Sequence, residues 1–357
     1  MPERFIIIKD GGLERLALPR AKRSILQCAV NIHREGVTPK SRLAHNLLRL
    51  NAWLGTLLWM PGARSGVPER LNGFELSGWL DHVAGRLGQK KLYASIAFPP
   101  KIAENRFVAF LVSTAGQSVG FAKVSRDDFT DHQIRTEIAG LEKMAAFRAT
   151  SFSIPAVLDS GIYDGHQYAV LESIIASARS GVTDMNLRLE QMLRELAASF
   201  SINQPTDCSW WPGLETAGVL VQPLVELVRQ RQNQPIQVCL SHGDFGVGNT
   251  LQRRDIAFLY DWEEFCGDAP RFTDWFFFLL PPAQIKSYGL VEVAGAYDVA
   301  FERIRLFYPE VTHWDLGLAL LLLSTRRNWV ASPETTRILA EVIYQRCLRD
   351  DHKNRVS

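Results

Sequence analysis

Apolar residues recur along the chain first with the period of strands and later with the period of helices. Segments rich in β-branched and aromatic side chains predict three strands, at 91–98, 106–113 and 119–125. The turn at 114–117 would join the last two as a hairpin. Apolar residues then recur at spacings of four, three and four, at Ile134, Ile138, Leu141 and Ala145. This spacing predicts a helix with one apolar face, and two short strands are predicted after it, at 156–158 and 167–172.

After Ser173 the pattern is mainly helical, with helices predicted at 187–199, 223–230, 291–307 and 314–330. One strand-like interruption spans 238–262. The start of the chain is less regular, with a strand at 5–8, a helix at 41–54 and a stretch broken by Gly and Pro at 61–73. We therefore predict an α+β chain with a small antiparallel-sheet lobe carrying one key helix and a larger, mainly helical lobe. The expected divisions are an N-terminal extension of unclear role at 1–85, the sheet lobe at 86–173 and the helical lobe at 174–357.

The composition is that of a well-packed globular protein, with 46% apolar and 22% charged residues. A chain of 357 residues exceeds the size at which a single core keeps growing, in line with two lobes. The formal charge of +2 gives no field that would favour nucleic acid as the main partner. The apolar run at the start ends at Lys9 and Asp10, and the longest apolar stretches are shorter than a bilayer span. We expect no signal peptide, no integral membrane segment and a cytoplasmic location.

The first fifty residues are basic, with ten Lys or Arg against four Asp or Glu. Such an excess either forms a solvated face or meets an anionic partner, such as a membrane surface, and the sequence leaves both open. The five cysteines are odd in number, widely scattered and without a C-x-x-C pair, so neither a disulfide framework nor a zinc site is predicted.

The segment that carries chemistry runs from Ser241 to Asn249 and reads S-H-G-D-F-G-V-G-N; an apolar run then leads to Asp261-Trp262-Glu263. Phosphoryl transfer needs a carboxylate that orients the attacking hydroxyl and oxygen ligands that hold magnesium against the phosphates. Asp244, Asn249 and Asp261 offer these groups. A turn at 253–255 would form a hairpin that returns Asp261 toward Asn249.

H-G-D-x-x-x-x-N, followed about a dozen residues later by an apolar strand ending in D-W-E, resembles the aminoglycoside phosphotransferase and choline kinase families. The resemblance implies a two-lobed, protein-kinase-like fold, with ATP and magnesium as cofactors. It implies that Asp244 is the catalytic base or hydroxyl-orienting group, that His242 braces the catalytic loop, and that Asn249 and Asp261 bind magnesium. By the same resemblance Asp274, after Gly267-Asp268-Ala269-Pro270, holds the loop and takes no part in the chemistry.

The sheet lobe supplies the remaining groups that a kinase needs. Lys123 lies in an apolar strand, where it would contact phosphates, and Glu137 follows fourteen residues later on the predicted helix, where it would orient the lysine. Adenine is expected near Leu171, Glu172 and Ser173, which resemble the strand that runs into the interlobe hinge. The turn between the first two strands, at 98–106, contains no glycine, so no loop that covers the phosphates is assigned.

These features predict a small-molecule kinase that moves the γ-phosphate of ATP to a hydroxyl group. The acceptor is open among sugars, aminoglycosides, amino alcohols and lipid-linked saccharides; Trp210 and Trp211, beside a Pro-Gly pair, are the aromatic residues expected to be exposed near it. A catalytically silent nucleotide-binding scaffold is the alternative, although the full set of site residues argues against it. A metal-dependent hydrolase using His242 and Asp244 ranks last because the ligand spacing of such sites is missing. ATP against GTP, the oligomeric state and the role of residues 1–85 are not readable from the sequence.

Overall fold

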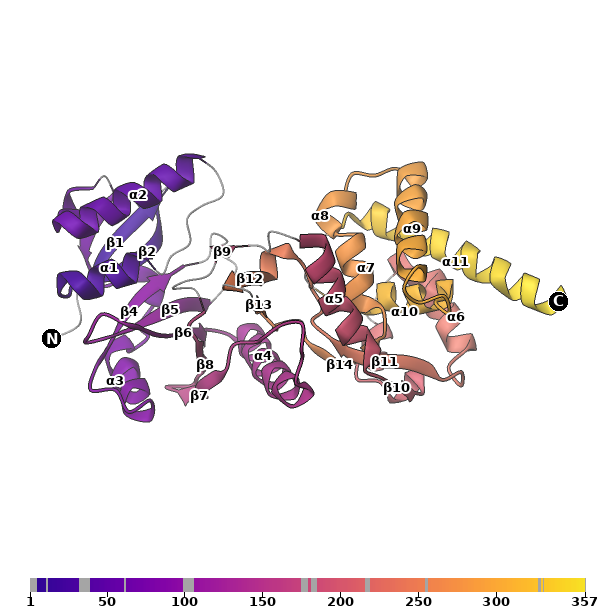
Figure 1. Ribbon diagram of the computed structural model, residues 1–357, viewed down its shortest axis with the longest axis horizontal. Coiled ribbons are helices and arrows are strands. Elements are labelled where there is room, and N and C mark those ends of the chain that lie inside the picture. Colours follow the sequence, from indigo (N-terminus) through magenta and orange to yellow (C-terminus); the bar gives the residue numbers. More distant parts are fainter. Residues whose placement is uncertain are drawn as a thin grey trace. The chain divides into compact units, whose positions relative to one another are not determined.

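The computed structural model describes residues 5–10, 12–31, 39–60, 62–98, 106–174, 179–180, 185–215, 219–253, 256–326, 329 and 331–356 (Figure 1). The chain forms two compact units. The first consists of Met1–Arg148, Phe152–Val182 and Thr250–Glu263, and the second of Ala149–Ser151, Thr183–Asn249 and Glu264–Ser357. These bounds differ from the expected divisions at 85/86 and 173/174, because the first 85 residues and the stretch 250–263 both belong to the first unit.

The first unit is built on an eight-stranded sheet in which every described neighbour pair is antiparallel. Its strand order is β3-β1-β2-β4-β5-β6-β8-β7. The strands are β1 (Phe5–Asp10), β2 (Leu13–Pro19), β3 (Ala63–Gly66), β4 (Leu92–Ala97), β5 (Arg106–Ser113), β6 (Ser118–Ser125), β7 (Val157–Tyr163) and β8 (His166–Glu172). The three strands predicted at the centre of the sheet lobe are confirmed as β4, β5 and β6. The predicted hairpin turn between the last two is closed by a hydrogen bond from the Gly116 amide to the Ser113 carbonyl.

The first 85 residues extend this sheet and cover both of its faces. β1 pairs with β2 and β3, and β2 continues the sheet by pairing with β4. The helices α1 (Arg23–Asn31) and α2 (Pro39–Leu54) pack on one face, where Leu26 and Leu48 join a cluster with Ile6 and Leu18. The helix α3 (Leu76–Arg86) contributes the fully buried Trp79 to the cluster on the other face. The N-terminal segment is therefore a structural part of the first unit.

Helix α4 (Asp128–Phe147) is the key helix of the sheet lobe and follows β6 directly. Its start is fixed by Asp127, whose carboxylate accepts from the Thr130 amide at 2.8 Å in a capping box. The helix ends at Arg148, which adopts the left-handed conformation at φ 55°. Of the predicted apolar face, Ile134 and Leu141 are buried, but Ile138 is only partly buried and Ala145 is exposed; Glu137 is buried on the same helix.

A hairpin returns to the first unit from a later part of the chain. β12 (Thr250–Arg253) pairs with β13 (Ile256–Leu259), and β12 also pairs with the short β9 (Arg179–Ser180). Ser153 ties the hairpin to the unit, because its amide donates to the Ala257 carbonyl at 2.8 Å and its carbonyl accepts from the Leu259 amide at 2.9 Å. The hairpin predicted between Asn249 and Asp261 is confirmed; residues 254 and 255 of its turn lie outside the described residues.

The second unit is mainly helical and includes a three-stranded sheet in the order β10-β11-β14. The strands are β10 (Phe200–Asn203), β11 (Ile236–Ser241) and β14 (Cys266–Pro270), and the helices are α5 (Met185–Ala198), α6 (Gln222–Gln230), α7 (Thr273–Leu279), α8 (Pro282–Ile285), α9 (Leu290–Arg305), α10 (His313–Ser324) and α11 (Pro333–Val356). The predicted α+β class, with an antiparallel sheet lobe and a mainly helical part, is confirmed. Among the described residues no helix combines the length and the apolar character needed to cross a bilayer.

Candidate active site

Lys123 lies in the interior of the first unit, on β6. Its strand pairs with β5 at Val108 and with β8 at Ala169, so the backbone at this position is held from both sides. The lysine side chain is 8% exposed. A buried ammonium is costly unless it is paired with opposite charge, so the contacts of Lys123 are structurally important.

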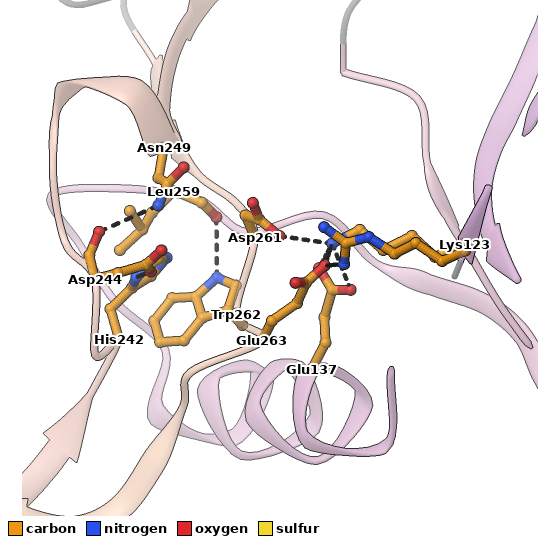
Figure 2. A network of polar contacts seen from close by, with 10 residues as sticks. Lys123, Glu137, His242, Asp244, Asn249, Leu259, Asp261, Trp262 and Glu263 are labelled. Atoms are coloured by element: carbon orange, nitrogen blue, oxygen red, sulfur yellow. Dashed lines mark hydrogen bonds and ion pairs between the residues drawn. The ribbon is translucent and has the colours of Figure 1, made fainter. Parts of the chain in front are cut away.

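Three carboxylates surround the Lys123 ammonium. Its Nζ lies 2.8 Å from Oε2 of Glu137, 2.6 Å from Oδ1 of Asp261 and 2.6 Å from Oε1 of Glu263. Figure 2 shows Glu137 reaching the lysine from helix α4, while the other two carboxylates come from the chain just after the hairpin. An ammonium has three N–H donors, and each has a carboxylate within hydrogen-bonding distance. The predicted pairing of Lys123 with Glu137 is thus present, and Asp261 joins it.

A second cation completes this group. Arg106, the first residue of β5, forms an ion pair with the same Oε1 of Glu263 that contacts Lys123. We call Lys123, Arg106, Glu137, Asp261 and Glu263 the Lys123 cluster. The sequence analysis singled out neither Glu263 nor Arg106 as a site residue. The sequence does contain a signal for Glu263, because two acidic residues flank the tryptophan in Asp261-Trp262-Glu263. In the structure Trp262 is fully buried and its indole N–H donates to the Leu259 carbonyl. The two acidic side chains both contact Lys123.

The charged groups of the cluster shift one another's pKa values. Burial by itself lowers the pKa of Lys123, but Asp261, Glu137 and Glu263 outweigh it and raise that pKa well above its usual value. Burial raises the pKa of Glu137 to about 7, against the opposing effect of Lys123. Desolvation also acts to raise the pKa of Asp261, yet the Lys123 ammonium holds it well below its usual range. At neutral pH Lys123 and Asp261 are therefore charged, while Glu137 is close to its midpoint.

Asp261 differs from its neighbours in exposure and backbone conformation. Its side chain is 33% exposed, whereas that of Glu137 is fully buried and that of Glu263 is 7% exposed. Its φ of 70° lies in the left-handed region that non-glycine residues seldom adopt. Backbone strain of this kind concentrates at functional sites, where surrounding structure holds it in place. Asp261 is thus the member of the cluster best placed to exchange Lys123 for a ligand.

The segment Ser241–Asn249, which we call the Asp244 loop, is held within the second unit by Asp274. The Asp274 carboxylate accepts from the Ser241 hydroxyl at 2.9 Å, the His242 amide at 2.8 Å and the Gly243 amide at 2.9 Å. Burial raises the pKa of Asp274, although these donors and His242 oppose the shift. The expectation that Asp274 holds the loop agrees with these contacts.

Gly243 is the residue that lets the loop turn. Its φ is 90°, and a Cβ built at this position would lie 2.2 Å from the carbonyl oxygen of Glu264. No side chain fits there without displacing backbone. Two residues further on, the fully buried Phe245 packs edge-on against His242 and against Phe278 of α7. The loop is thus fixed by backbone geometry and by one aromatic anchor.

The chemically relevant side chains of the loop are arranged around Asp244. The Nδ1 of His242, which is fully buried, lies 2.9 Å from Oδ1 of Asp244 (Figure 2). The Asn249 amide nitrogen donates to the Asp244 backbone carbonyl at 3.1 Å. Asp244 keeps a partly exposed side chain, at 15%, so it is the loop carboxylate that a ligand can reach. His242 therefore contacts Oδ1 of this carboxylate from the interior of the unit.

The donor groups fit a magnesium ion. Mg²⁺ prefers oxygen ligands, and carboxylate oxygens of Glu137, Asp261 and Glu263 lie within 4.8 Å of one another. The Lys123 ammonium lies among these oxygens, so the partly exposed Asp261 is the carboxylate suited to a metal, while Glu137 and Glu263 pair with the lysine. Asn249 offers its amide oxygen, since its nitrogen is already engaged. In the first unit Asp261 thus presents a carboxylate oxygen, and in the second unit Asn249 presents an amide oxygen.

The segment expected to bind adenine lies at the end of β8. Leu171 is fully buried, and the Glu172 amide donates to the Ala156 carbonyl at 2.8 Å. Ser173 accepts a hydrogen bond from the Ser118 hydroxyl at 2.6 Å. The neighbouring strand approaches closely, because a Cβ at Gly120 would lie 2.6 Å from the Leu171 carbonyl oxygen. These contacts fix the strand end, and its role in adenine binding stays a prediction.

The expectation for Trp210 is wrong. Trp210 is 5% exposed, and its indole N–H donates to the Asp268 carbonyl at 2.9 Å, so it belongs to the core of the second unit. Trp211 is partly exposed beside it. Trp262 and Trp275 are also buried, in line with core packing. The glycine-free turn considered for the phosphates lies mostly outside the described residues, which omit 99–105.

Comparisons with known proteins find distant structural similarities and no match in sequence. The chain matches no protein-family model and no curated protein. It is similar in structure to aminoglycoside phosphotransferases and related small-molecule kinases. The wild-type aminoglycoside 2'-phosphotransferase-IIIa in complex with GDP is 10% identical, over 75% of this chain and 98% of that one, with a TM-score of 0.42.

Two further matches are a spectinomycin phosphotransferase with ADP and spectinomycin and an amicoumacin kinase with AMP-PNP and Ca²⁺. The first is 13% identical over 75% of this chain and 97% of that one, with a TM-score of 0.41. The second is 17% identical over 70% and 84% of the two chains, with a TM-score of 0.41. These similarities are distant, so the chemistry proposed below rests on the residues of this chain.

Proposed function

We propose that this chain is a phosphotransferase that uses ATP and magnesium to phosphorylate a hydroxyl group of a small molecule. The observation that carries the proposal is the Lys123 cluster. Lys123, buried on a strand, is oriented by the buried Glu137 of helix α4, and its Nζ lies 2.6 Å from Oδ1 of the partly exposed Asp261. A lysine that only stabilised the core would not need a strained, partly exposed carboxylate beside it. A lysine that contacts phosphates needs both an orienting partner and an exchangeable one.

The roles of the residues follow from their contacts. Glu137 and Glu263 hold the Lys123 ammonium in place from buried positions, and Asp261 gives up its share of the lysine when a phosphate oxygen arrives. Asp261 and Asn249 would hold magnesium, which neutralises phosphate charge when bound. Arg106, paired with Glu263, adds a second positive charge at the start of β5. Leu171, Glu172 and Ser173 are proposed to border the adenine, as expected from the sequence.

In the second unit, Asp244 is proposed to orient the acceptor hydroxyl and to accept its proton late in transfer. The Nδ1 of the buried His242 lies 2.9 Å from Oδ1 of Asp244, and Asp274 accepts a hydrogen bond from the His242 backbone amide. Charge neutralisation and positioning supply the catalysis, because phosphoryl transfer requires little covalent chemistry from the protein.

The acceptor class stays open, and sugars, aminoglycosides and amino alcohols are the first to screen. The cytoplasmic location and the absence of nucleic-acid partners stay predictions; the five cysteines are free, as a reducing compartment would leave them.

The test is the change in thermal unfolding produced by ATP with magnesium, in the wild type and in Asp261→Ala. A ligand at a hundred times its dissociation constant stabilises the folded state by about 2.7 kcal/mol. We expect a magnesium-dependent shift in the wild type that Asp261→Ala loses. The matched control is Asp81→Ala, an exposed aspartate on α3 in the same unit, which should keep the shift.

No shift in the wild type would contradict nucleotide binding. A shift without turnover for any acceptor class would instead indicate a silent nucleotide-binding protein. Detection of ADP formation that depends on an added acceptor separates these two outcomes.

A further inference from the structure

Helix α2 carries a row of exposed leucines on the face opposite its packed side. Leu43, Leu47, Leu50 and Leu54 follow at spacings of four, three and four, which places them within an arc of about 60° on a helix of 3.6 residues per turn. Their exposed fractions are 62%, 46%, 51% and 54%. We call these four residues the leucine stripe.

The leucine stripe takes no part in holding the helix to the first unit. The packed side of α2 is formed by Leu48 and Ala52, which are buried against β1, β2 and α1. These positions lie on the opposite side of the helix from the stripe. An ordinary surface helix would carry polar residues where the stripe lies. The stripe is therefore an apolar surface that the fold itself does not use.

Two further exposed apolar residues follow α2 in the sequence. After Gly55, which has a φ of 76°, the chain forms a short 3₁₀ turn (Leu57–Trp59) in which Leu57 is buried. Leu58 is 40% exposed and Trp59 is 85% exposed, the largest exposed fraction among the large apolar residues described. An indole has an apolar body and a polar N–H, a combination that favours the boundary between lipid and water.

The charges on α2 are all of one sign. The helix contains no Asp or Glu, while it contains Lys40, Arg42 and Arg49. Arg49 is exposed on α2 itself. From α1, Arg23 stacks over the exposed Trp53 of α2 with its guanidinium 4.4 Å from the ring centre. Cations thus flank an apolar row on a helix that has no anion of its own.

This combination fits one kind of partner. We propose that the leucine stripe, with Trp59 and the flanking cations, docks this chain on an anionic lipid surface. An amphipathic helix with leucine and tryptophan on one face and Lys or Arg beside it lies flat in the membrane interface, with its apolar side chains at the acyl boundary. Each nearby cation adds attraction to acidic headgroups.

A second copy of the chain fits less well. Packing two stripes together would bring Arg23 and Arg49 of one copy toward those of the other, with no acidic residue on α2 to pair with them. An anionic bilayer would present acidic headgroups to these cations. The inference does not depend on the phosphotransferase activity, since the stripe shares no residue with the Lys123 cluster or the Asp244 loop.

The test is sedimentation of the full chain with vesicles of phosphatidylcholine mixed with phosphatidylglycerol, compared with vesicles of phosphatidylcholine alone. We expect binding to the anionic vesicles that weakens at high salt. Leu47→Gln with Leu50→Gln should lower the partition coefficient by about tenfold or more, because two leucines would no longer enter the acyl boundary. Arg49→Gln should lower it by about fivefold on anionic vesicles only.

The matched control is Leu290→Gln with Val291→Gln, which removes two exposed apolar residues of α9 and should bind like the wild type. Wild-type protein that stays in the supernatant, or a stripe variant that binds equally well, would overturn the proposal. Sedimentation velocity supplies the remaining arm: a wild-type dimer that the stripe variant converts to monomer would assign the stripe to a second copy and would equally overturn the lipid assignment.

Discussion

The Lys123 cluster and the Asp244 loop are both buried polar arrangements, but they are held together in different ways. In the first unit two cations and three carboxylates satisfy one another through side chains alone. In the second unit a single carboxylate, Asp274, accepts two backbone amides and one hydroxyl, and a glycine allows the turn. Hydrogen bonds from backbone donors thus hold the Asp244 loop, and ion pairs between side chains hold the Lys123 cluster.

The difference separates a rigid part from a responsive one. Asp274 fixes the backbone around His242 and Gly243 whatever is bound, because main-chain amides do not titrate. The contacts of the Lys123 cluster depend on the protonation of Glu137, whose pKa lies at about 7, and on Asp261, whose side chain is partly exposed. We expect the loop to be preorganised and the cluster to rearrange with ligand and pH. The predictions below test this contrast, from the largest expected effect to the smallest.

Asp244→Asn should reduce turnover by about 10²–10⁴-fold, the range for losing a group that takes part in proton transfer. Nucleotide affinity should stay within about twofold, since the Lys123 cluster is untouched. Steady-state kinetics and a nucleotide titration measure the two effects separately. Asp298→Asn, which changes an aspartate paired with Arg346 in the same unit, should leave both unchanged. Equal loss of affinity and turnover would contradict a role limited to the acceptor hydroxyl.

Asp274→Asn should lower the free energy of unfolding by about 1–3 kcal/mol, the cost of leaving buried donors without an acceptor. The amide retains one oxygen, and its NH₂ group then faces either the His242 amide or the Gly243 amide, depending on its orientation. The neutral amide also avoids the cost of burying a charge, which raises the pKa of Asp274, and this offsets part of the loss. Urea unfolding gives the number, and unchanged stability with unchanged turnover would show that the loop does not need this brace.

Glu137→Gln should change how stability depends on pH. The folded-state pKa of Glu137 is about 7, above the ordinary value of 4.5, so the folded protein binds this proton more tightly than the unfolded chain. Wild-type stability should therefore fall relative to the variant as pH rises from about 4.5 to 7, by on the order of 1–3 kcal/mol, and the difference should be constant above that range.

Thermal melts at a series of pH values test this dependence. Glu142→Gln, an exposed residue of the same helix, should run parallel to the wild type throughout. Parallel curves for Glu137→Gln as well would mean that folding does not raise the pKa of Glu137, and the cluster would then be less responsive than proposed.

Thiol labelling under native conditions should be slow in the sheet behind the Asp244 loop. Burial raises the pKa of Cys266 to about 11 and holds the pKa of Cys239 higher still, so neither thiol ionises readily near pH 8. The half-buried Cys28 of the first unit should react first. Faster labelling of Cys239 in Asp274→Asn would show that the brace also keeps β11 closed; rapid labelling of both thiols in the wild type would contradict a rigid second unit.

Much of the site could be predicted because its signals are local. H-G-D, its downstream asparagine and the D-W-E segment are short motifs, and the strand and helix that carry Lys123 and Glu137 are adjacent in sequence. The site residues that were not predicted are those whose contacts join segments far apart in the sequence. Arg106 and Glu263 form an ion pair across more than 150 residues of chain, which no local pattern indicates.

The fold shows the same limit. The strand at 5–8 and the helix at 41–54 were predicted, but joining them to the sheet requires β1 to pair with β3 and β2 with β4. Trp210 was expected to be exposed because it lies beside Pro-Gly; a backbone carbonyl that satisfies its indole N–H instead allows burial. The apolar pattern also did not single out α11, because its residues are mostly polar and mark no clear stripe.

The first unit is completed by Thr250–Glu263, a stretch that follows much of the second unit in the sequence. During synthesis the sheet with Lys123 and Glu137 leaves the ribosome long before Asp261 and Glu263 exist. Until they arrive, a nascent chain holds a lysine that has only one of its three carboxylates. A fragment that ends at residue 182 contains most of this unit's strands and lacks Asp261 and Glu263, so we expect it to be less stable than the same unit in the full chain.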